Sequence, residues 1–331
     1  MVMEIVCPAG TPAALRAAVK AGAHSVYCGF ADETNARNFP GLNFARDEMR
    51  EGVAFAHAHG SKVLIAINTF ARAGDEHIWH AALHDAAQAG ADAVILADPG
   101  LLDYAARNLA GLRRHLSVQA AAANADIINL YAREFAIKRV VLPRVLSVAE
   151  IAEINAETEV ETEVFVFGGL CVMAEGRCSL SSYVTGKSPN MHGVCSPPSH
   201  VQYHEEAGKL SAQLGGYTIH QVARGAPAPY PTLCKGCFSA GEGADEKQGH
   251  LFEDAVSLNA EQLIPQLARA GVTALKIEGR QRSRSYVAQV VRNFRAAVDA
   301  LEAGQPMPQG MLARLSEGQA ATTGAYKKSW R

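Results

Sequence analysis

Short runs of β-branched and other apolar residues alternate with amphipathic patterns along most of this chain. Brief apolar runs predict strands, whereas apolar positions that recur every three or four residues predict helices. The predicted strands are Glu4–Pro8, Ser25–Gly29, Lys62–Asn68, Ala93–Ala97, His115–Gln119, Arg139–Pro143, Glu163–Phe167 and Ala274–Glu278. The predicted helices include Pro12–Ala21, Arg46–His59, Glu76–Ala89, Ala125–Glu134, Val148–Asn155 and Leu258–Ala270.

Three of these helices end in the same way, with a glycine just before the next strand: Gly22, Gly90 and Gly271. Glycine is typical of a helix C-terminus because it adopts the left-handed backbone conformation without steric cost. Eight strands that alternate with helices predict an α/β fold, a closed (β/α)8 TIM-like barrel. An open doubly wound sheet is the alternative, but no G-x-G-x-x-G follows the first strand.

The connection after the seventh strand, from Gly168 to about Ser257, is much longer than the others. It is rich in proline and glycine, which indicates irregular backbone with short strands or turns. We therefore expect barrel strands one to seven in residues 1–167 and an insert in residues 168–257. The last barrel unit, with strand eight and a C-terminal helix and tail, should occupy residues 258–331.

Five of the seven cysteines lie in this insert, at Cys171, Cys178, Cys195, Cys234 and Cys237. Thiolates are soft ligands that suit iron-sulfur clusters and structural zinc. Zinc sites usually show paired close spacings, and only Cys234 and Cys237 are close, so the pattern favours an iron-sulfur cluster over zinc or simple burial. Because loops after the strand carboxyl ends form the active face of a barrel, the cysteines should lie beside the barrel mouth.

The composition narrows the function classes. The chain has 331 residues and a net charge of -2, so it lacks the basic balance expected for avid nucleic-acid binding. No apolar run approaches the roughly 20 residues that a membrane span needs, and the first ten residues do not resemble a signal peptide. An odd cysteine count fits reduced thiols or metal ligands better than disulfides. We expect a cytoplasmic protein.

Several segments resemble one known family, the collagenase-like peptidase superfamily, over nearly the whole chain. The segments are Gly168–Cys178, Asn35–Phe39, Gln119-Ala120, Leu142-Pro143-Arg144 and Lys276–Arg280. Within that superfamily the chain is most similar to the UbiU-like, ubiquinone-biosynthesis branch. The segments that carry this closer likeness are Asp32–Arg37, Ile65–Phe70 and Tyr230–Gly236.

The resemblance implies a 4Fe-4S cluster on Cys171, Cys178, Cys195 and Cys234. It also implies oxygen-independent hydroxylation of a ubiquinone precursor, prephenate as the oxygen donor, and a heterodimer with a related, UbiV-like subunit. A lipid-carrier protein would suit a precursor that has an isoprenoid tail. Cys237 departs from the family pattern and leaves the fourth ligand open between Cys234 and Cys237; Cys234 is preferred.

Prephenate carries two carboxylates, and guanidinium groups pair bidentately with such anions. We therefore expect substrate-binding roles for Arg37, Arg144, Arg177 and Arg280, which follow predicted strand ends, and for Gln119 and Glu278. Each arginine could instead form an ion pair that holds a loop. Lys276 and Glu278 could form an internal pair or transfer protons. The sequence identifies no catalytic residue.

Three other functions remain open. Relatives within the superfamily hydroxylate RNA bases, so a transfer or ribosomal RNA base is the main alternative substrate, although the charge balance makes nucleic acid a less expected partner. The chain could also be a non-catalytic subunit that carries the cluster. Peptidase activity is the weak alternative, because no H-E-x-x-H or G-x-S-x-G motif occurs.

Overall fold

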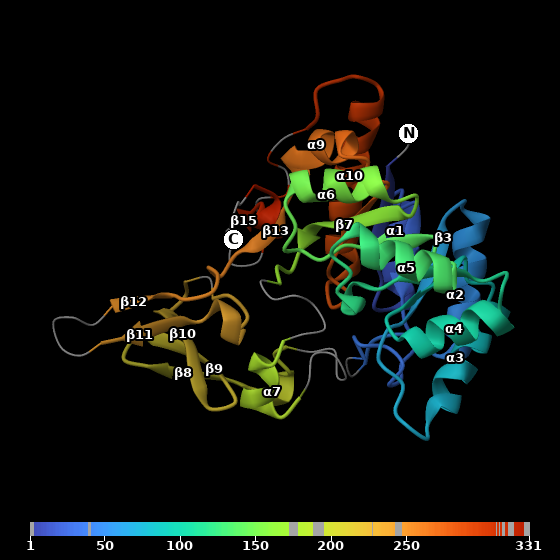
Figure 1. Ribbon diagram of the computed structural model, residues 1–331. Coiled ribbons are helices and arrows are strands. Elements are labelled where there is room, and N and C mark those ends of the chain that lie inside the picture. The colour runs from blue at the N-terminus through green and yellow to red at the C-terminus, as the bar shows by residue number, and fades with distance from the viewer. Residues whose placement is uncertain are drawn as a thin grey trace.

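Eight parallel strands form a closed barrel in the computed structural model of the protein (Figure 1). The structure describes residues 3–38, 41–171, 178–187, 195–226, 228–241, 247–308, 310, 312, 315–316 and 321–327. The barrel strands are β1 (Glu4–Pro8), β2 (Ser25–Cys28), β3 (Lys62–Ile67), β4 (Ala93–Leu96), β5 (Arg113–Leu116), β6 (Arg139–Val141), β7 (Glu161–Gly168) and β14 (Ala274–Ile277). Strand β14 pairs with both β1 and β7 and thereby closes the barrel. The predicted fold class is confirmed.

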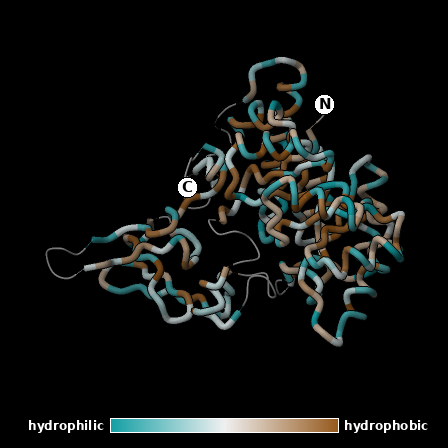
Figure 2. Tube along the Cα trace, viewed as in Figure 1, coloured by the Kyte–Doolittle hydropathy of each residue, from teal (hydrophilic) through white to brown (hydrophobic). Residues whose placement is uncertain are grey.

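Helices surround the barrel and cover its strands with their apolar faces (Figure 2). They are α1 (Pro12–Lys20), α2 (Arg46–Ala58), α3 (Glu76–Gln88), α4 (Pro99–Asn108), α5 (Ala125–Phe135), α6 (Val148–Glu157), α9 (Ile264–Arg269) and α10 (Arg284–Glu302). Gly22, Gly90 and Gly271 all have positive φ angles, between 80° and 96°. The predicted glycine turns are therefore present at these three helix ends.

Two sequence predictions were wrong in detail. The fifth strand begins at Arg113 and ends at Leu116, and Val118–Ala120 forms a 3-10 turn in which Ser117 caps the backbone amide of Gln119. The predicted helix Leu258–Ala270 is only partly helical, because its first residues belong to β13 (Ser257–Asn259). This strand pairs antiparallel with the end of β7, and a 3-10 turn at Glu261–Leu263 separates it from α9.

The long connection between β7 and β13 forms a separate lobe beside the barrel (Figure 1). It contains helix α7 (Leu180–Thr185) and two small antiparallel sheets. The first sheet consists of β8 (Val201–Glu206), β9 (Lys209–Leu214) and β10 (Tyr217–Ala223); the second consists of β11 (Cys237–Ala240) and β12 (Lys247–His250). A two-residue strand, β15 (Ala321–Thr322), pairs with β13. We call the lobe formed by the connection between β7 and β13 the insert.

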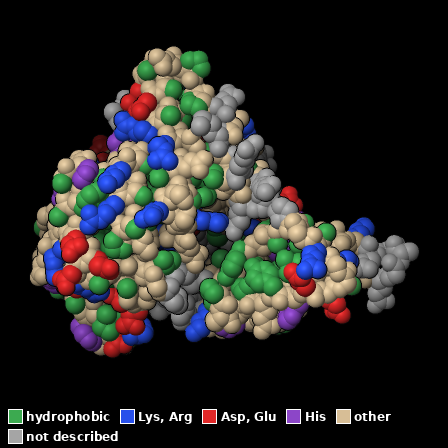
Figure 3. Space-filling view, turned by 180° about the vertical axis from the view of Figure 1, so that it is seen from behind, with side chains coloured by type: hydrophobic (Ala, Val, Ile, Leu, Met, Phe, Trp, Pro, Cys, Tyr) green, Lys and Arg blue, Asp and Glu red, His purple; other side chains and the backbone are tan. Residues whose placement is uncertain are grey.

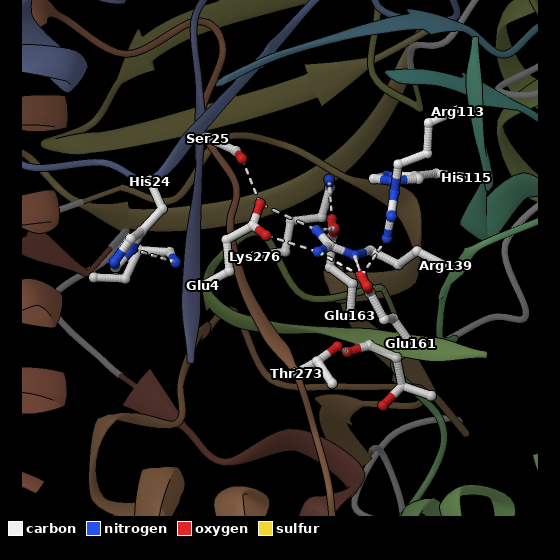
Figure 4. A network of polar contacts seen from close by, with 12 residues as sticks. Glu4, His24, Ser25, Arg113, His115, Arg139, Glu161, Glu163, Thr273 and Lys276 are labelled. Carbon is white, nitrogen blue, oxygen red and sulfur yellow. Dashed lines mark hydrogen bonds and ion pairs between the residues drawn. The ribbon is translucent and has the colours of Figure 1, made fainter. Parts of the chain in front are cut away.

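Charged side chains fill the amino-terminal end of the barrel interior (Figure 4). Arg139 donates hydrogen bonds to Glu4 at 2.7 Å, to Glu161 at 2.9 Å and to Glu163 at 3.2 Å. Lys276 donates to the other carboxylate oxygen of Glu163 at 2.5 Å. We call these five residues the base network. The active face of such barrels lies at the opposite end, so we assign the base network a structural role.

We expect the free energy of unfolding to fall in acid because Glu4 becomes protonated. Burial alone would raise the pKa of this carboxyl, but Arg139 and Ser25 bind the carboxylate and lower the pKa from 4.5 to about 2. Because the pKa is lower in the folded state, the stabilisation is complete above about pH 4.5 and is lost as the pH falls toward 2. Over this window we expect the wild type to lose about 3 kcal/mol more unfolding free energy than Glu4→Gln. Urea unfolding at several pH values measures this, and parallel losses in both proteins would contradict it.

Candidate functional site

A cavity of about 520 Å³ opens at the carboxyl ends of the barrel strands, between the barrel and the insert. Its apolar wall includes Tyr27, Ile95, Phe165 and Leu170, and Cys195 of the insert also lines it. One carboxylate, Glu278, lies among the lining residues, together with a larger set of cations: Arg37, Arg144, Lys235, Lys276, Arg280 and Arg282. The lining thus combines an excess of positive charge with apolar and aromatic surface.

Glu278 follows the last residue of β14 and lies between two of the predicted arginines. Arg144 donates a 2.8 Å hydrogen bond to its carboxylate, and Arg37 lies 4.0 Å away. The guanidinium of Arg144 also stacks on Phe165, 3.5 Å from the ring centroid. Burial would raise the pKa of Glu278, but Arg144, Arg37 and Lys235 together lower it. Glu278 is therefore an ionised acceptor at neutral pH.

Two glycines allow Glu278 to approach the end of β7. A Cβ atom on Gly169 would lie 2.7 Å from the Glu278 carboxylate, and one on Gly168 would lie 2.7 Å from the Glu278 carbonyl oxygen. Gly168 also has a φ of +112°, which L side chains rarely adopt. The glycine pair at the start of the insert is thus required by the backbone and by Glu278.

Arg280 is buried, and its guanidinium carbon lies 5.6 Å from the centroid of the Tyr27 ring. Among the described residues, no carboxylate lies within ion-pair distance of it. Its Nη1 donates a 2.9 Å hydrogen bond to Oδ1 of Asn35. The same oxygen accepts the backbone amide of Arg37 at 3.0 Å. Asn35 therefore links two of the predicted arginines, a role that the sequence motif contains but does not reveal.

Lys276 points into the barrel from β14 and contacts the face of Tyr27, 3.8 Å from the ring centroid. Its carboxylate partner is Glu163 of the base network. The expected internal pair between Lys276 and Glu278 is therefore not formed, and Glu278 is instead held by arginines. Lys276 connects the base network with the cavity, which it also lines.

Among the polar residues at other strand ends, Gln119 lines the cavity, and its Oε1 has no hydrogen-bond partner within the described residues. Asn68 accepts the backbone amide of Ala36, at 3.0 Å. Asp98 and Asn124 cap helices α4 and α5. Asn68 and Gln119 both line the cavity, and Gln119 is the one whose buried side-chain oxygen has no hydrogen-bond partner among the described residues. Arg177 and Glu175 lie outside the described residues.

Three insert cysteines lie within electrostatic reach of one another. Ser181 of α7 donates a 2.7 Å hydrogen bond to the Cys195 carbonyl, and Tyr230 donates to the Ser196 carbonyl at 3.1 Å. These bonds join the segments that carry Cys178, Cys195 and Cys234. Burial, followed by the nearby thiols of Cys195 and Cys178, raises the pKa of Cys234 to about 11. Burial also raises the pKa of the Cys195 thiol, although the residue is exposed overall.

Soft sulfur ligands are what a thiolate-bound cluster needs, and one of the predicted ligands, Cys195, lines the cavity. Cys171 is half-buried just after Leu170, while Cys237 begins β11 opposite His250. Across the described ranges, no three His, Cys, Asp or Glu side chains lie close enough to hold a metal ion. The four-cysteine site therefore stays a prediction.

Two further observations concern the rest of the molecule. A second cavity of about 490 Å³ lies between α9 and the end of α10 and contains none of the predicted site residues. None of the helices in the described ranges combines the length and the apolar composition that crossing a lipid bilayer requires.

Comparison with known proteins places this architecture in a family. The model for peptidase family U32 matches residues 10–326. The chain is 30% identical to tRNA hydroxylation protein P of Escherichia coli (94% of this chain, 71% of that protein). It is 28% identical to the 23S rRNA 5-hydroxycytidine C2501 synthase of Escherichia coli (96% and 42%) and 27% identical to a collagenase of Porphyromonas gingivalis (90% and 66%). With a family match over almost its whole length, the chain belongs to peptidase family U32.

Proposed function

We propose that this chain is an iron-sulfur protein that acts in oxygen-independent hydroxylation of a ubiquinone precursor. The observation that carries the proposal is the cavity at the barrel mouth, where six cationic side chains and one carboxylate lie beside Cys195. Such a site suits an anionic oxygen donor of small size, and we propose prephenate for that role. The names of the relatives support hydroxylation as the type of reaction.

We propose that Cys171, Cys178, Cys195 and Cys234 hold a 4Fe-4S cluster at the cavity wall. Bound by these four thiolates, such a cluster would supply electron transfer. The protein residues then have three tasks. Arginines bind the carboxylates of the donor, Tyr27 and Phe165 exclude water from its ring, and the ionised Glu278 accepts a hydrogen bond from a hydroxyl group.

An RNA base is the second candidate substrate, because the relatives at 30% and 28% identity are named for tRNA hydroxylation and for rRNA hydroxycytidine synthesis. We prefer the ubiquinone precursor on two grounds. The net charge of -2 gives no general attraction for a phosphate backbone. Three segments, Asp32–Arg37, Ile65–Phe70 and Tyr230–Gly236, resemble the ubiquinone-biosynthesis branch.

We also propose a heterodimer with a related, UbiV-like subunit in the cytoplasm. Among the described residues, most large exposed hydrophobic side chains lie in the insert: Tyr183, Tyr203, Tyr217, Tyr230, Leu251 and Phe252. Figure 3 shows hydrophobic side chains gathered on the surface of this lobe. Exposed apolar patches of this kind are typical of interaction surfaces. We propose that a lipid-carrier protein that presents the isoprenoid tail also binds this surface.

Peptidase activity is a weaker alternative, although one relative is named a collagenase. A cysteine nucleophile needs a lowered thiol pKa so that the thiolate forms at neutral pH. The pKa values of the Cys195 and Cys234 thiols are raised instead.

Anaerobic growth of a deletion strain tests the proposal. We expect hydroxylated quinone to be lost, restored by the wild-type gene and not restored by Cys171→Ser, while the nucleosides of tRNA and rRNA stay unchanged. Loss of an RNA hydroxyl group with normal quinone would instead establish the RNA candidate. Full quinone synthesis with Cys171→Ser would contradict a role for the cluster.

A further inference from the structure

The cations of the cavity differ in whether the protein already neutralises them. Arg144 and Arg37 share Glu278, and Lys276 pairs with Glu163. Arg280 is also buried, with 8% of its surface exposed, yet no carboxylate of the described residues lies within ion-pair distance of it. Its polar partner is the neutral side chain of Asn35.

A buried charge without an opposite charge is unfavourable, because desolvation is not offset by an ion pair. Burial is accordingly the main cause that lowers the pKa of Arg280 to about 10, and the group remains cationic at neutral pH. Folded proteins usually pair such groups. An unpaired guanidinium that lines a cavity is therefore suited to an anion that arrives from outside.

Neighbouring residues restrict both the guanidinium group and the backbone of Arg280. Asn35, which is 1% exposed, accepts from Nη1 of Arg280 and donates to the Phe30 carbonyl at 3.2 Å. A Cβ atom on Gly29 would lie 2.4 Å from the Asn35 amide, so the asparagine has little freedom. At the backbone, a Cβ atom on Gly10 would lie 2.0 Å from the Arg280 carbonyl oxygen. The guanidinium is thus preorganised before any ligand binds.

We propose that Arg280 binds a carboxylate group of the small ligand in the cavity, and that Asn35 is the positioning residue that orients it. Arg144 and Arg37 then act mainly by holding Glu278. The inference rests on the proposed function only for the identity of the ligand.

The proposal predicts an unusual combination of binding and stability. Arg280→Gln removes the unpaired cation and should weaken binding of a carboxylate probe by roughly tenfold to a hundredfold. The ligand-free variant should unfold at a temperature no lower than that of the wild type, because an uncompensated buried charge is gone. Glu278→Gln should unfold at a lower temperature, because it removes the carboxylate charge to which Arg144 donates its 2.8 Å hydrogen bond.

Calorimetric titration of the full-length, anaerobically purified protein measures the binding, with prephenate, phenylpyruvate and inorganic phosphate as separate probes. Arg292→Gln, at an exposed position, is the control with the same change in charge. Asn35→Asp is a second test, since it introduces a carboxylate at the position of the oxygen that Arg280 contacts. It should weaken carboxylate binding to a similar extent, even if Arg280→Gln fails to fold.

The inference is supported if Arg280→Gln and Asn35→Asp bind prephenate or phenylpyruvate more weakly than the wild type, while Arg292→Gln binds it equally well. This outcome does not depend on whether any strain forms a hydroxylated quinone. Equal binding by the wild type and the two variants overturns the inference. So does a wild type that binds neither carboxylate probe, or one that binds only inorganic phosphate. An unfolding temperature for Arg280→Gln as low as that of Glu278→Gln would make Arg280 a structural residue instead.

Discussion

Replacement of Cys234 by serine is expected to remove most of the iron and acid-labile sulfide from the anaerobically purified protein. A serine hydroxyl is a poor substitute for a soft thiolate, and three remaining cysteines hold a cluster weakly. Cys234 is the informative position because the thiols of Cys195 and Cys178 lie close enough to raise its pKa. Iron and sulfide analysis, together with the visible absorption spectrum, measures the effect.

Cys237→Ser is the matched control, since Cys237 lies only three residues away but begins β11 opposite His250. It should retain the iron and the colour of the wild type. A colourless wild-type protein with bound zinc would contradict the cluster. If Cys237→Ser lost its iron and Cys234→Ser retained it, Cys237 and not Cys234 would be the fourth ligand.

Replacement of Arg139 by methionine is expected to reduce the free energy of unfolding by about 3–5 kcal/mol. The side chain of Arg139 is 5% exposed and contacts the carboxylates of Glu4, Glu161 and Glu163. Without it, Glu163, which has no exposed surface, keeps Lys276 as its one charged partner among the residues that the structure describes. The cost arises from carboxylates that remain buried without sufficient positive charge. Urea unfolding near neutral pH measures it.

Arg133→Met is the control for this variant, because Arg133 forms an exposed ion pair with Glu134. Exposed pairs contribute only about 0–1 kcal/mol, so the control should unfold almost like the wild type. An Arg139→Met protein that loses no more stability than the control would show that the base network does not stabilise the barrel.

The barrel was predictable from local patterns because its strands are short, almost fully buried and separated by helices with distinct ends. Where a residue pairs with a distant part of the chain, local patterns were insufficient. Leu258 has the apolar spacing of a helix, but it pairs with Gly168 at the end of β7 and becomes part of a strand. Strand β8 has mostly exposed residues and no clear alternation, so its position in the insert was not predictable.

The same contrast between local sequence patterns and pairing of distant segments applies to the site. The pattern of strand ends predicted that Arg37, Arg144, Arg280, Gln119 and Glu278 would lie near the mouth, and all five line the cavity. Their partners depend on the register of strands far apart in sequence. Lys276 contacts Glu163 because β14 pairs in parallel with β7, and the register shifts directly after Lys276. A period-two pattern within one strand contains no information about that shift.

The glycine pair at Gly168 and Gly169 has an evolutionary consequence. These residues fix the point at which the chain leaves the barrel, because any side chain there would collide with Glu278. The chain returns through β13, which pairs beside the same exit. Exit and return are therefore neighbours, so a lobe of different length or sequence could be exchanged between members of the family without disturbing the barrel, provided that the two glycines are kept.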